Sequence, residues 1–259
     1  MTTATLGTVL RDWRQRRHLS QLDLALEAGV SARHLSFLET GRSKPSRQMV
    51  IHLSEQLEVP LRDRNRLLLA AGFAPAYDER PIDAPEMAPV RQALDRVLAG
   101  HEPYPAIVVD RWWNLIGANR SVAMFTGVAA PHLLEPPANV IRASLHPEGM
   151  APHIVNLGEW RAHLLDRLRR QAAVTGDERL QALLDETSAY PGDEDGHTVA
   201  GGDIATPLRF RHEGRELAFF STVTTFGTAV DITLAELSIE AFFPADTQTG
   251  DALRALPLR

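Results

Sequence analysis

The feature that most constrains the fold is the run from Leu19 to Pro45, which carries two start signals and two stop signals for helices. Ser20 and Ser31 each precede a segment with apolar residues at helical spacing, and serine is a favoured N-cap residue. Gly29 and Gly41 follow these segments, where a left-handed residue ends a helix without steric strain. The run therefore predicts two short helices joined by a tight turn.

Apolar residues at helical spacing extend this pair to a set of five helices, which predicts an all-α domain over residues 1–74. The five helices are expected over residues 6–17, 21–28, 32–39, Ser46 to Leu57 and 61–71. Two short helices with a tight turn allow the second of them to project from the body of such a domain and enter the major groove of DNA.

The motif resembles the repressor-like (XRE, lambda-repressor-like) helix-turn-helix family, and the resemblance covers residues 6–71. The matching residues are Ser20-Gln21, Gly29-Val30-Ser31, Leu38-Glu39-Thr40-Gly41-Arg42 and Pro45. The resemblance implies a DNA-binding domain whose recognition helix is the second of the pair. The residues expected at the DNA are Gln21, Ser31, Ala32, Arg33, His34, Ser36, Phe37, Arg42, Lys44 and Arg47.

The chemistry of these side chains suggests separate roles at the DNA. Arg33 can donate two parallel hydrogen bonds to guanine and so read a base. Arg42, Lys44 and Arg47 follow the helix and suit phosphates, which supply affinity without reading sequence. For Phe37, packing in the core is an equally good interpretation.

The charge is divided unequally along the chain. Residues 1–74 contain 11 Lys and Arg against 7 Asp and Glu, a net charge of +4. Residues 75–259 contain 16 against 26, a net charge of −10. A basic module joined to an acidic body is compatible with DNA contact concentrated in the basic part.

Residues 75–104 are rich in proline and charge and predict a linker followed by a connecting helix, over about 87–99. Beyond them the pattern predicts an α+β domain with an antiparallel sheet over residues 105–245 and a loosely ordered tail over 246–259. Helices are expected over residues 119–126, 160–171 and 179–187. Strands are expected over residues 106–109, 112–116, 207–212, 215–226 and 233–243, with Glu213-Gly214 as a two-residue hairpin turn.

The second domain resembles the ligand-binding domain of MmyB-like transcription regulators over about residues 105–245. The resemblance rests on Pro105–Phe125, Leu145–Met150, Ile154–Trp160 and Glu216–Thr228. It implies a PAS-like fold with a pocket for a fatty acid or a similar amphipathic molecule, although most of these apolar residues would also suit an ordinary core. The expected ligand-binding residues are Trp112, Asn114, Met124, Phe125, Arg142, His146, His153, Trp160, Leu164, Phe210, Phe219, Phe220 and Thr222.

The sequence offers little for catalysis or metal binding. It has no cysteine, and it lacks the glycine-rich phosphate loops and the nucleophile motif of hydrolases. His146 and His153 do not have a metal-ligand spacing, and Asp193–Asp195 predicts a solvated loop. No enzyme, cofactor or metal is therefore expected. The absence of a long apolar run and of a signal peptide predicts a cytoplasmic protein, associated with the nucleoid when it is bound to DNA.

Three hypotheses remain at this point. The first is a transcription regulator that binds a double-stranded operator as a homodimer and responds to an apolar ligand, without a membrane partner. The second is a constitutive DNA-binding regulator whose C-terminal domain only dimerises. The third is an enzyme fused to a DNA-binding domain, against which the missing catalytic motifs argue.

Overall fold

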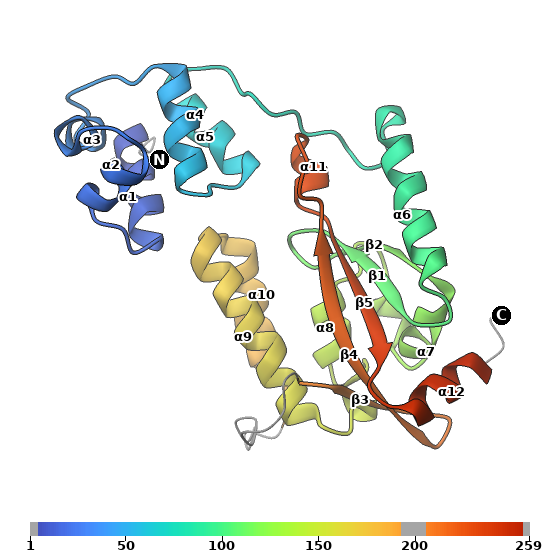
Figure 1. The fold of residues 1–259 in the computed structure, drawn as a ribbon. Coiled ribbons are helices and arrows are strands. Elements are labelled where there is room, and N and C mark those ends of the chain that lie inside the picture. The colour runs from blue at the N-terminus through green and yellow to red at the C-terminus, as the bar shows by residue number, and fades with distance from the viewer. Residues whose placement is uncertain (1–4, 193–205, 256–259) are drawn as a thin grey trace. The chain divides into compact units, whose positions relative to one another are not determined.

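A computed structural model describes residues 5–192 and 206–255 of the chain (Figure 1). The chain divides into two compact units. The first unit comprises Met1–Pro81 together with Thr228–Ala235, and the second comprises Ile82–Gly227 together with Glu236–Arg259. The charge run at Asp193–Asp195 lies outside the described residues.

The first unit contains the five expected helices. They are α1 (Leu6–Arg16), α2 (Gln21–Glu27), α3 (Ala32–Glu39), α4 (Arg47–Gln56) and α5 (Leu61–Ala70). A single apolar core holds them together, and its fully buried members include Leu24, Leu35, Leu53 and Leu68. These bounds confirm the helical fold that the leucine spacing predicts.

Local capping explains where the helices of the pair begin and end. The Ser20 hydroxyl accepts the backbone N–H of Asp23 at 3.1 Å, and the Asp23 carboxylate accepts the N–H of Ser20 at 2.9 Å, which completes a capping box. The Ser31 hydroxyl caps α3 by accepting the N–H of His34 at 3.1 Å. Gly29 and Gly41 adopt φ angles of 62° and 71° after α2 and α3, in the left-handed region that glycine tolerates best.

Gly7 allows α1 and α3 to approach closely. A Cβ atom at this position would lie 2.4 Å from the carbonyl oxygen of Glu39, far inside van der Waals contact. This contact depends on a glycine in the first helix. Any side chain at Gly7 must displace α3.

The segment after the fourth strand also belongs to the first unit. It contains the short helix α11 (Ile232–Ala235), and Ile232 is buried and donates its N–H to the carbonyl of Asp78 at 2.8 Å. Arg80 donates to the buried carboxylate of Asp231 at 2.9 Å. The prediction of a strand beginning at residue 233 is therefore wrong at its start, because Asp231 caps a helical turn there by accepting the N–H of Thr233.

The second unit is built on one antiparallel sheet of five strands in the order β2-β1-β5-β4-β3 (Figure 1). The strands are β1 (Ala106–Val109), β2 (Leu115–Ala118), β3 (Leu208–His212), β4 (Arg215–Thr225) and β5 (Ser238–Pro244). Glu213 and Gly214 both have positive φ, as a two-residue hairpin turn requires. The expected α+β class with an antiparallel sheet is confirmed.

Helices cover this sheet. They are α6 (Ala88–Gly100), α7 (Ala123–Thr126), α8 (Val140–Leu145), α9 (Leu157–Thr175), α10 (Glu178–Ser188) and α12 (Thr247–Ala255), with short 3-10 turns at Pro85–Met87, Arg120–Val122, Pro131–Leu133 and Ala151–His153. Ile107, Phe219 and Phe242 belong to the large core shared with α7, α8, α9 and α10. On the other side of the sheet, Leu98 of α6 reaches Gly117. No helix within the described ranges has both the length and the apolar character needed to cross a membrane.

Two predictions for this unit are wrong. The second strand begins at Leu115 instead of residue 112, because the Asp110 carboxylate accepts the N–H groups of Trp112 and Asn114 and closes a turn. The residues after Pro244 include helix α12 instead of a loose tail. Thr249 anchors this helix by accepting the N–H of Ala218, on strand β4.

Candidate functional site

The recognition helix expected from the sequence is α3, and it presents one face outward. Leu35 and Leu38 are 0% and 1% exposed and fix the inner face. Of the residues predicted at the DNA, Ser31 and Arg33 are exposed, whereas Ala32, His34, Ser36 and Phe37 are half-buried. The structure therefore leaves Arg33 as the long exposed side chain on this helix.

Phe37 supports Arg33 and the loop that follows α3. The Arg33 guanidinium lies 5.3 Å from the centre of the Phe37 ring, within the range of a cation–π contact. The Phe37 carbonyl accepts the N–H of Arg42 at 2.8 Å and that of Ser43 at 3.2 Å. Phe37 thus combines packing with the positioning of two cations.

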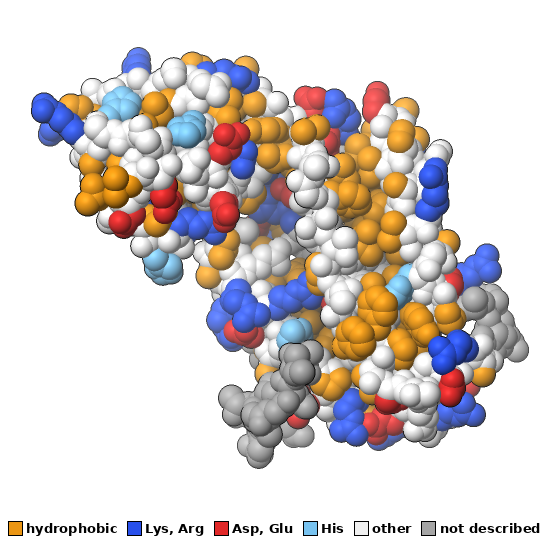
Figure 2. All heavy atoms as spheres, in the orientation of Figure 1, with side chains coloured by type: hydrophobic (Ala, Val, Ile, Leu, Met, Phe, Trp, Pro, Cys, Tyr) orange, Lys and Arg blue, Asp and Glu red, His pale blue; other side chains and the backbone are white. Residues whose placement is uncertain are grey.

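Four exposed cations gather on and just after α3. They are Arg33, Arg42, Lys44 and Arg47, and in the described part of the chain none of them forms an ion pair. Figure 2 shows basic side chains over the α3 end of the first unit. Cations that form no ion pair within the described part of the protein are available to bind phosphate oxygens.

A buried ionic cluster holds α3 against α1 and α2. Glu39, whose side chain is fully buried, accepts hydrogen bonds from Arg14 at 2.7 and 2.9 Å, from Gln21 at 2.9 Å and from Arg11 at 3.3 Å. Gln21 was expected at the DNA, and its side-chain amide is bonded inward to Glu39. Glu39 and Arg14 were not predicted as functional residues, because a charged pair in sequence does not reveal its burial.

The same cluster sets the ionisation of Glu39. Burial alone would raise its pKa, but the hydrogen bonds from Arg14, Gln21 and Arg11 and the charge of Arg14 outweigh burial and hold the pKa below its ordinary value. The cluster therefore stabilises the fold at pH values above the ordinary carboxyl pKa. That contribution is lost as the pH falls through the lowered pKa of the folded state.

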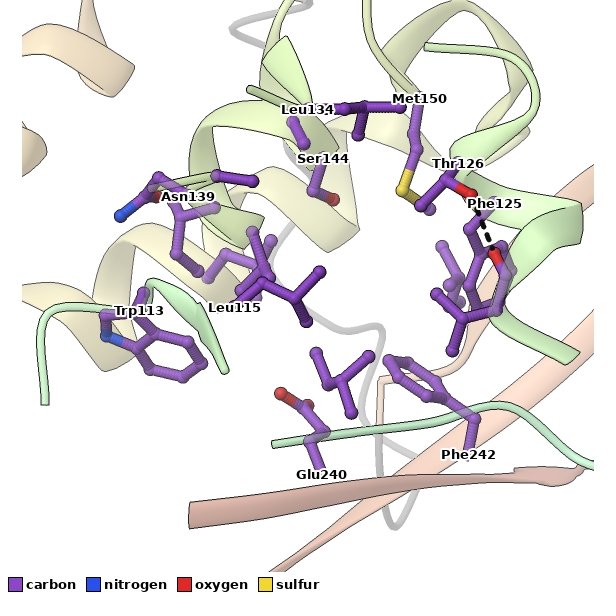
Figure 3. Close-up of a pocket in the computed structure, with 18 of the residues that line it drawn as sticks. Trp113, Leu115, Phe125, Thr126, Leu134, Asn139, Ser144, Met150, Glu240 and Phe242 are labelled. Carbon is purple, nitrogen blue, oxygen red and sulfur yellow. Dashed lines mark hydrogen bonds between the residues drawn. The ribbon is translucent and has the colours of Figure 1, made fainter. Parts of the chain in front are cut away.

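The second unit contains an apolar cavity of about 80 Å³ between the sheet and helices α7, α8 and α9 (Figure 3). Its lining is formed by Ile107, Trp113, Leu115, Val122, Phe125, Thr126, Leu134, Ala138, Asn139, Val140, Ile141, Ala143, Ser144, Met150, Trp160, Leu164, Leu208, Glu240 and Phe242. A cavity with a mainly apolar lining and a few polar groups is typical of a small-molecule site.

Three of the residues predicted to bind ligand line this cavity, namely Phe125, Trp160 and Leu164. The others do not line it. Met124, Phe210 and Phe219 are buried in the surrounding core, and Phe220 and Thr222 are exposed on β4. Trp112 instead donates its indole N–H to Asp177 at 3.0 Å. Asn114 donates its side-chain amide to Asp110.

The basic groups expected at the polar end of the ligand also lie elsewhere. Arg142 donates to both oxygens of Glu186 at 2.6 and 2.7 Å, which raises the pKa of Arg142 and lowers that of Glu186. Burial and the hydrogen bond to Glu186 raise the pKa of Tyr190 to about 12. His153 lies in the turn at Ala151–His153, with its ring 6.0 Å from that of Phe210.

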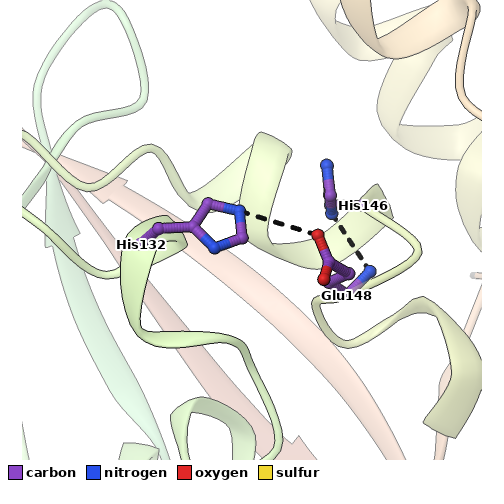
Figure 4. Close-up of side chains that lie close together, drawn as sticks. All are labelled: His132, His146 and Glu148. Atoms are coloured by element: carbon purple, nitrogen blue, oxygen red, sulfur yellow. Dashed lines mark hydrogen bonds and ion pairs between the residues drawn. The ribbon is translucent and has the colours of Figure 1, made fainter.

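His146 instead joins His132 and Glu148 in a cluster whose potential ligand atoms lie within 4.8 Å of one another (Figure 4). His132 was not singled out in the sequence, because the chain separates it from the other two. The Nδ1 atom of His146 accepts the backbone N–H of Glu148 at 3.0 Å. This hydrogen bond occupies one nitrogen of the His146 ring and stabilises the turn that follows α8.

His163, whose ring stacks on the cavity residue Trp160, should make the stability of α9 depend on pH. Its ring stacks on Trp160 at 5.5 Å, and burial together with the charge of Arg167 lowers its pKa. The neutral ring is thus favoured in the folded state, so its contribution to stability is complete above about pH 6.5 and is lost as the pH falls through the lowered pKa. We expect the hydrogen-exchange protection of α9, measured against the intrinsic exchange rate at each pH, to fall below about pH 6.5, and to fall less in His163→Gln. An equal fall in both proteins would contradict this assignment.

Comparison with known proteins assigns both units. Residues 90–256 match the family described as the MmyB-like transcription regulator ligand binding domain, and residues 10–63 match a helix-turn-helix family. Three relatives described as uncharacterized HTH-type transcriptional regulators, one from Mycobacterium bovis and two from strains of Mycobacterium tuberculosis, are 38% identical over 71 residues. That match covers 27% of this chain and 28% of each relative. Both resemblances noted in the sequence are confirmed.

Proposed function

This chain belongs to the MmyB-like transcription regulators, and on that premise we propose that an apolar, fatty-acid-like ligand in its second unit controls operator binding by its first. DNA binding and transcriptional regulation follow from the two families, which are those of a regulator and not of an enzyme. The proposal adds the kind of ligand, the effect on the operator, a PAS-like fold for the second unit and a homodimer as the DNA-bound form.

The observation that carries the proposal is the apolar cavity in the family's ligand-binding domain. Trp113, Phe125, Trp160 and Phe242 supply aromatic walls, and aliphatic side chains supply most of the remainder. A domain that served only dimerisation would have no use for such a space, since close packing is the ordinary state of a protein interior. The cavity therefore favours a ligand-responsive regulator over a constitutive one.

The chain connects the cavity covalently to the DNA-binding unit. Strand β5 contributes Glu240 and Phe242 to the cavity, and the segment Thr228–Ala235 that precedes this strand is part of the first unit. Ile232 and Asp231 anchor that segment to Asp78 and Arg80. A ligand that shifts β5 can thus act on the first unit through a short covalent connection.

A homodimer is proposed because α3 has 8 residues and can contact only a few base pairs. Regulators with this motif read a longer DNA sequence by placing two recognition helices one helical turn apart on the DNA. An operator selected from random duplex DNA with the full chain should therefore have two related half-sites. Two copies of the chain per operator are expected in sedimentation, and one copy would contradict the proposal.

Arg33→Ala tests the assignment of the recognition helix. We expect a loss of about 1–3 kcal/mol of binding free energy on the selected operator and relaxed specificity at one position, because Arg33 is placed to read a base. Arg47→Ala is the matched control, which should weaken binding evenly across sequences and reduce the slope of affinity against salt by about 1. Equal binding of Arg33→Ala and the parent across an operator library would contradict the assignment.

The ligand response is tested on the same operator by fluorescence anisotropy. Saturating the full chain with an alkyl ligand should change operator affinity by roughly 5–150-fold, which corresponds to an allosteric coupling of about 1–3 kcal/mol. Operator affinity that stays constant, under conditions where the ligand is shown to bind, would favour the constitutive regulator instead.

A further inference from the structure

One residue in the lining of the second unit's cavity has an ionisable side chain. Glu240 is the single ionisable residue in its lining, and the described lining contains no lysine, arginine or histidine. Figure 3 shows the Glu240 carboxylate directed toward the cavity at the end near Trp113 and Leu115. The polar end of the site is therefore an acid, whereas a fatty-acid carboxylate would require a base.

Glu240 is held firmly in this position. It lies on β5, where its backbone pairs with Ile107 of β1, and its side chain is 6% exposed. Arg167 donates to its Oε1 atom at 3.2 Å, whereas Oε2 accepts no hydrogen bond from any described residue. The Arg167 guanidinium itself lies 4.3 Å from the centre of the Trp113 ring and does not line the cavity.

The other polar side chains of the lining each make a hydrogen bond within the protein, including Thr126, whose hydroxyl donates to the carbonyl of Val122 at 3.4 Å. Asn139 donates its amide to the carbonyl of Trp112 and accepts the N–H of Arg142. The indole N–H of Trp113 is donated to Gln171, and the hydroxyl of Ser144 accepts the indole N–H of Trp160. Among the described residues no hydrogen bond reaches Glu240 Oε2, which leaves this oxygen able to accept one from an incoming group.

We infer that the ligand presents a hydrogen-bond donor, a hydroxyl or an amine on a short alkyl body, to Glu240. This inference rests on the proposed function, because it concerns the ligand of the same cavity, and it replaces the carboxylate end of a fatty-acid-like ligand with a hydrogen-bond donor. A carboxylate oxygen has acceptor sites but no donor, so a second carboxylate placed against Glu240 would repel it and leave the two facing oxygens without a donor. A hydroxyl or ammonium group satisfies Oε2 and leaves the bond from Arg167 in place.

The volume of the cavity limits the length of the ligand's alkyl body. A cavity of about 150 Å³ holds a benzene ring, so about 80 Å³ admits only a short alkyl body, whose end can extend through the open side of the cavity. A six-carbon chain with one polar group is short enough to test there. The matched series is therefore 1-hexanol, hexylamine and hexanoate, which share a body and differ in the polar end.

Titration calorimetry of the full chain at neutral pH tests the inference with these three compounds. We expect 1-hexanol and hexylamine to bind at least tenfold more tightly than hexanoate, a difference of about 1.4 kcal/mol, since only these two can donate a hydrogen bond to the Glu240 carboxylate. In Glu240→Gln the preference over hexanoate should shrink to less than threefold. Glu216→Gln, which alters an exposed glutamate of β4, is the control and should keep the preference of the parent.

The possible results distinguish two claims, that the ligand donates a hydrogen bond to Glu240 and that the cavity binds an alkyl ligand at all. Hexanoate binding as tightly as 1-hexanol in the parent protein overturns the donor inference and leaves the proposed ligand function standing. The same holds if Glu240→Gln is folded and keeps the full preference. Failure of all three compounds, and of longer alkyl chains, to bind the parent overturns the proposed ligand function itself. The parent comparison needs no variant, so it decides the matter even if Glu240→Gln does not fold.

Discussion

Replacing Glu39 with glutamine should lower the free energy of unfolding of the first unit by about 3–5 kcal/mol, the range for breaking a buried ion pair by removing one partner. The Arg14 side chain is 10% exposed and would remain buried without its counter-charge. Glutamine has nearly the shape of glutamate, so the loss reports charge and hydrogen bonding and not a cavity. Hydrogen exchange over α1, α2 and α3, measured in the full chain, follows this unit specifically.

Glu27→Gln is the matched control, because Glu27 is an exposed residue at the end of α2. It should change stability by less than about 0.5 kcal/mol, as surface substitutions do. The effect of Glu39→Gln should also shrink as the pH is lowered, because protonation of Glu39 in the parent removes the same charge. A loss of less than 1 kcal/mol for Glu39→Gln at neutral pH would contradict the role of the cluster in holding α3.

Replacing Phe125 with alanine should destabilise the second unit by about 3–5 kcal/mol. Phe125 is 4% exposed, and its ring lies 5.1–5.6 Å from the rings of Phe210, Phe219 and Phe242. Because Phe125 also lines the cavity, its removal enlarges the space for ligand. An alkyl ligand longer than six carbons should then restore part of the lost stability to the variant, as measured by its unfolding midpoint.

Phe220→Ala provides the comparison for this variant. Phe220 is on the same sheet but is 40% exposed, with its ring stacked on Phe243 at 5.3 Å. Its removal should destabilise less than that of Phe125 and should give no additional response to longer ligands. If both variants respond equally to chain length, Phe125 is not a wall of the ligand site.

The helices of the first unit could be predicted from the sequence because their signals are local. Ser20, Asp23 and Ser31 lie within one turn of the N–H groups they cap, and Gly29 and Gly41 act on their own backbone. The hairpin at Glu213-Gly214 is local in the same sense. In each case the residues that determine the structure are neighbours in the chain, so sequence spacing was sufficient.

The parts that could not be predicted depend on distant partners. Helix α12 is anchored by Thr249 to Ala218, and the segment around Asp231 is anchored to Arg80. Glu240 was missed because, in the sequence, it reads as one residue of a strand, and its burial becomes visible only when α9 brings Arg167 against it. Arg142 was expected at the ligand on chemistry alone, and its partner Glu186 lies 44 residues away.

The central claim is that occupation of the cavity controls operator binding, and a cavity-filling variant tests it most directly. Ala143→Phe places a ring in the lining at α8, and Ala93→Phe makes the same change at an exposed position of α6. Operator affinity of the parent, and of Ala93→Phe, should change at least fivefold when 1-hexanol is added, whereas that of Ala143→Phe should stay constant. An undiminished response in folded Ala143→Phe, or no response in a parent that binds 1-hexanol, would contradict the claim.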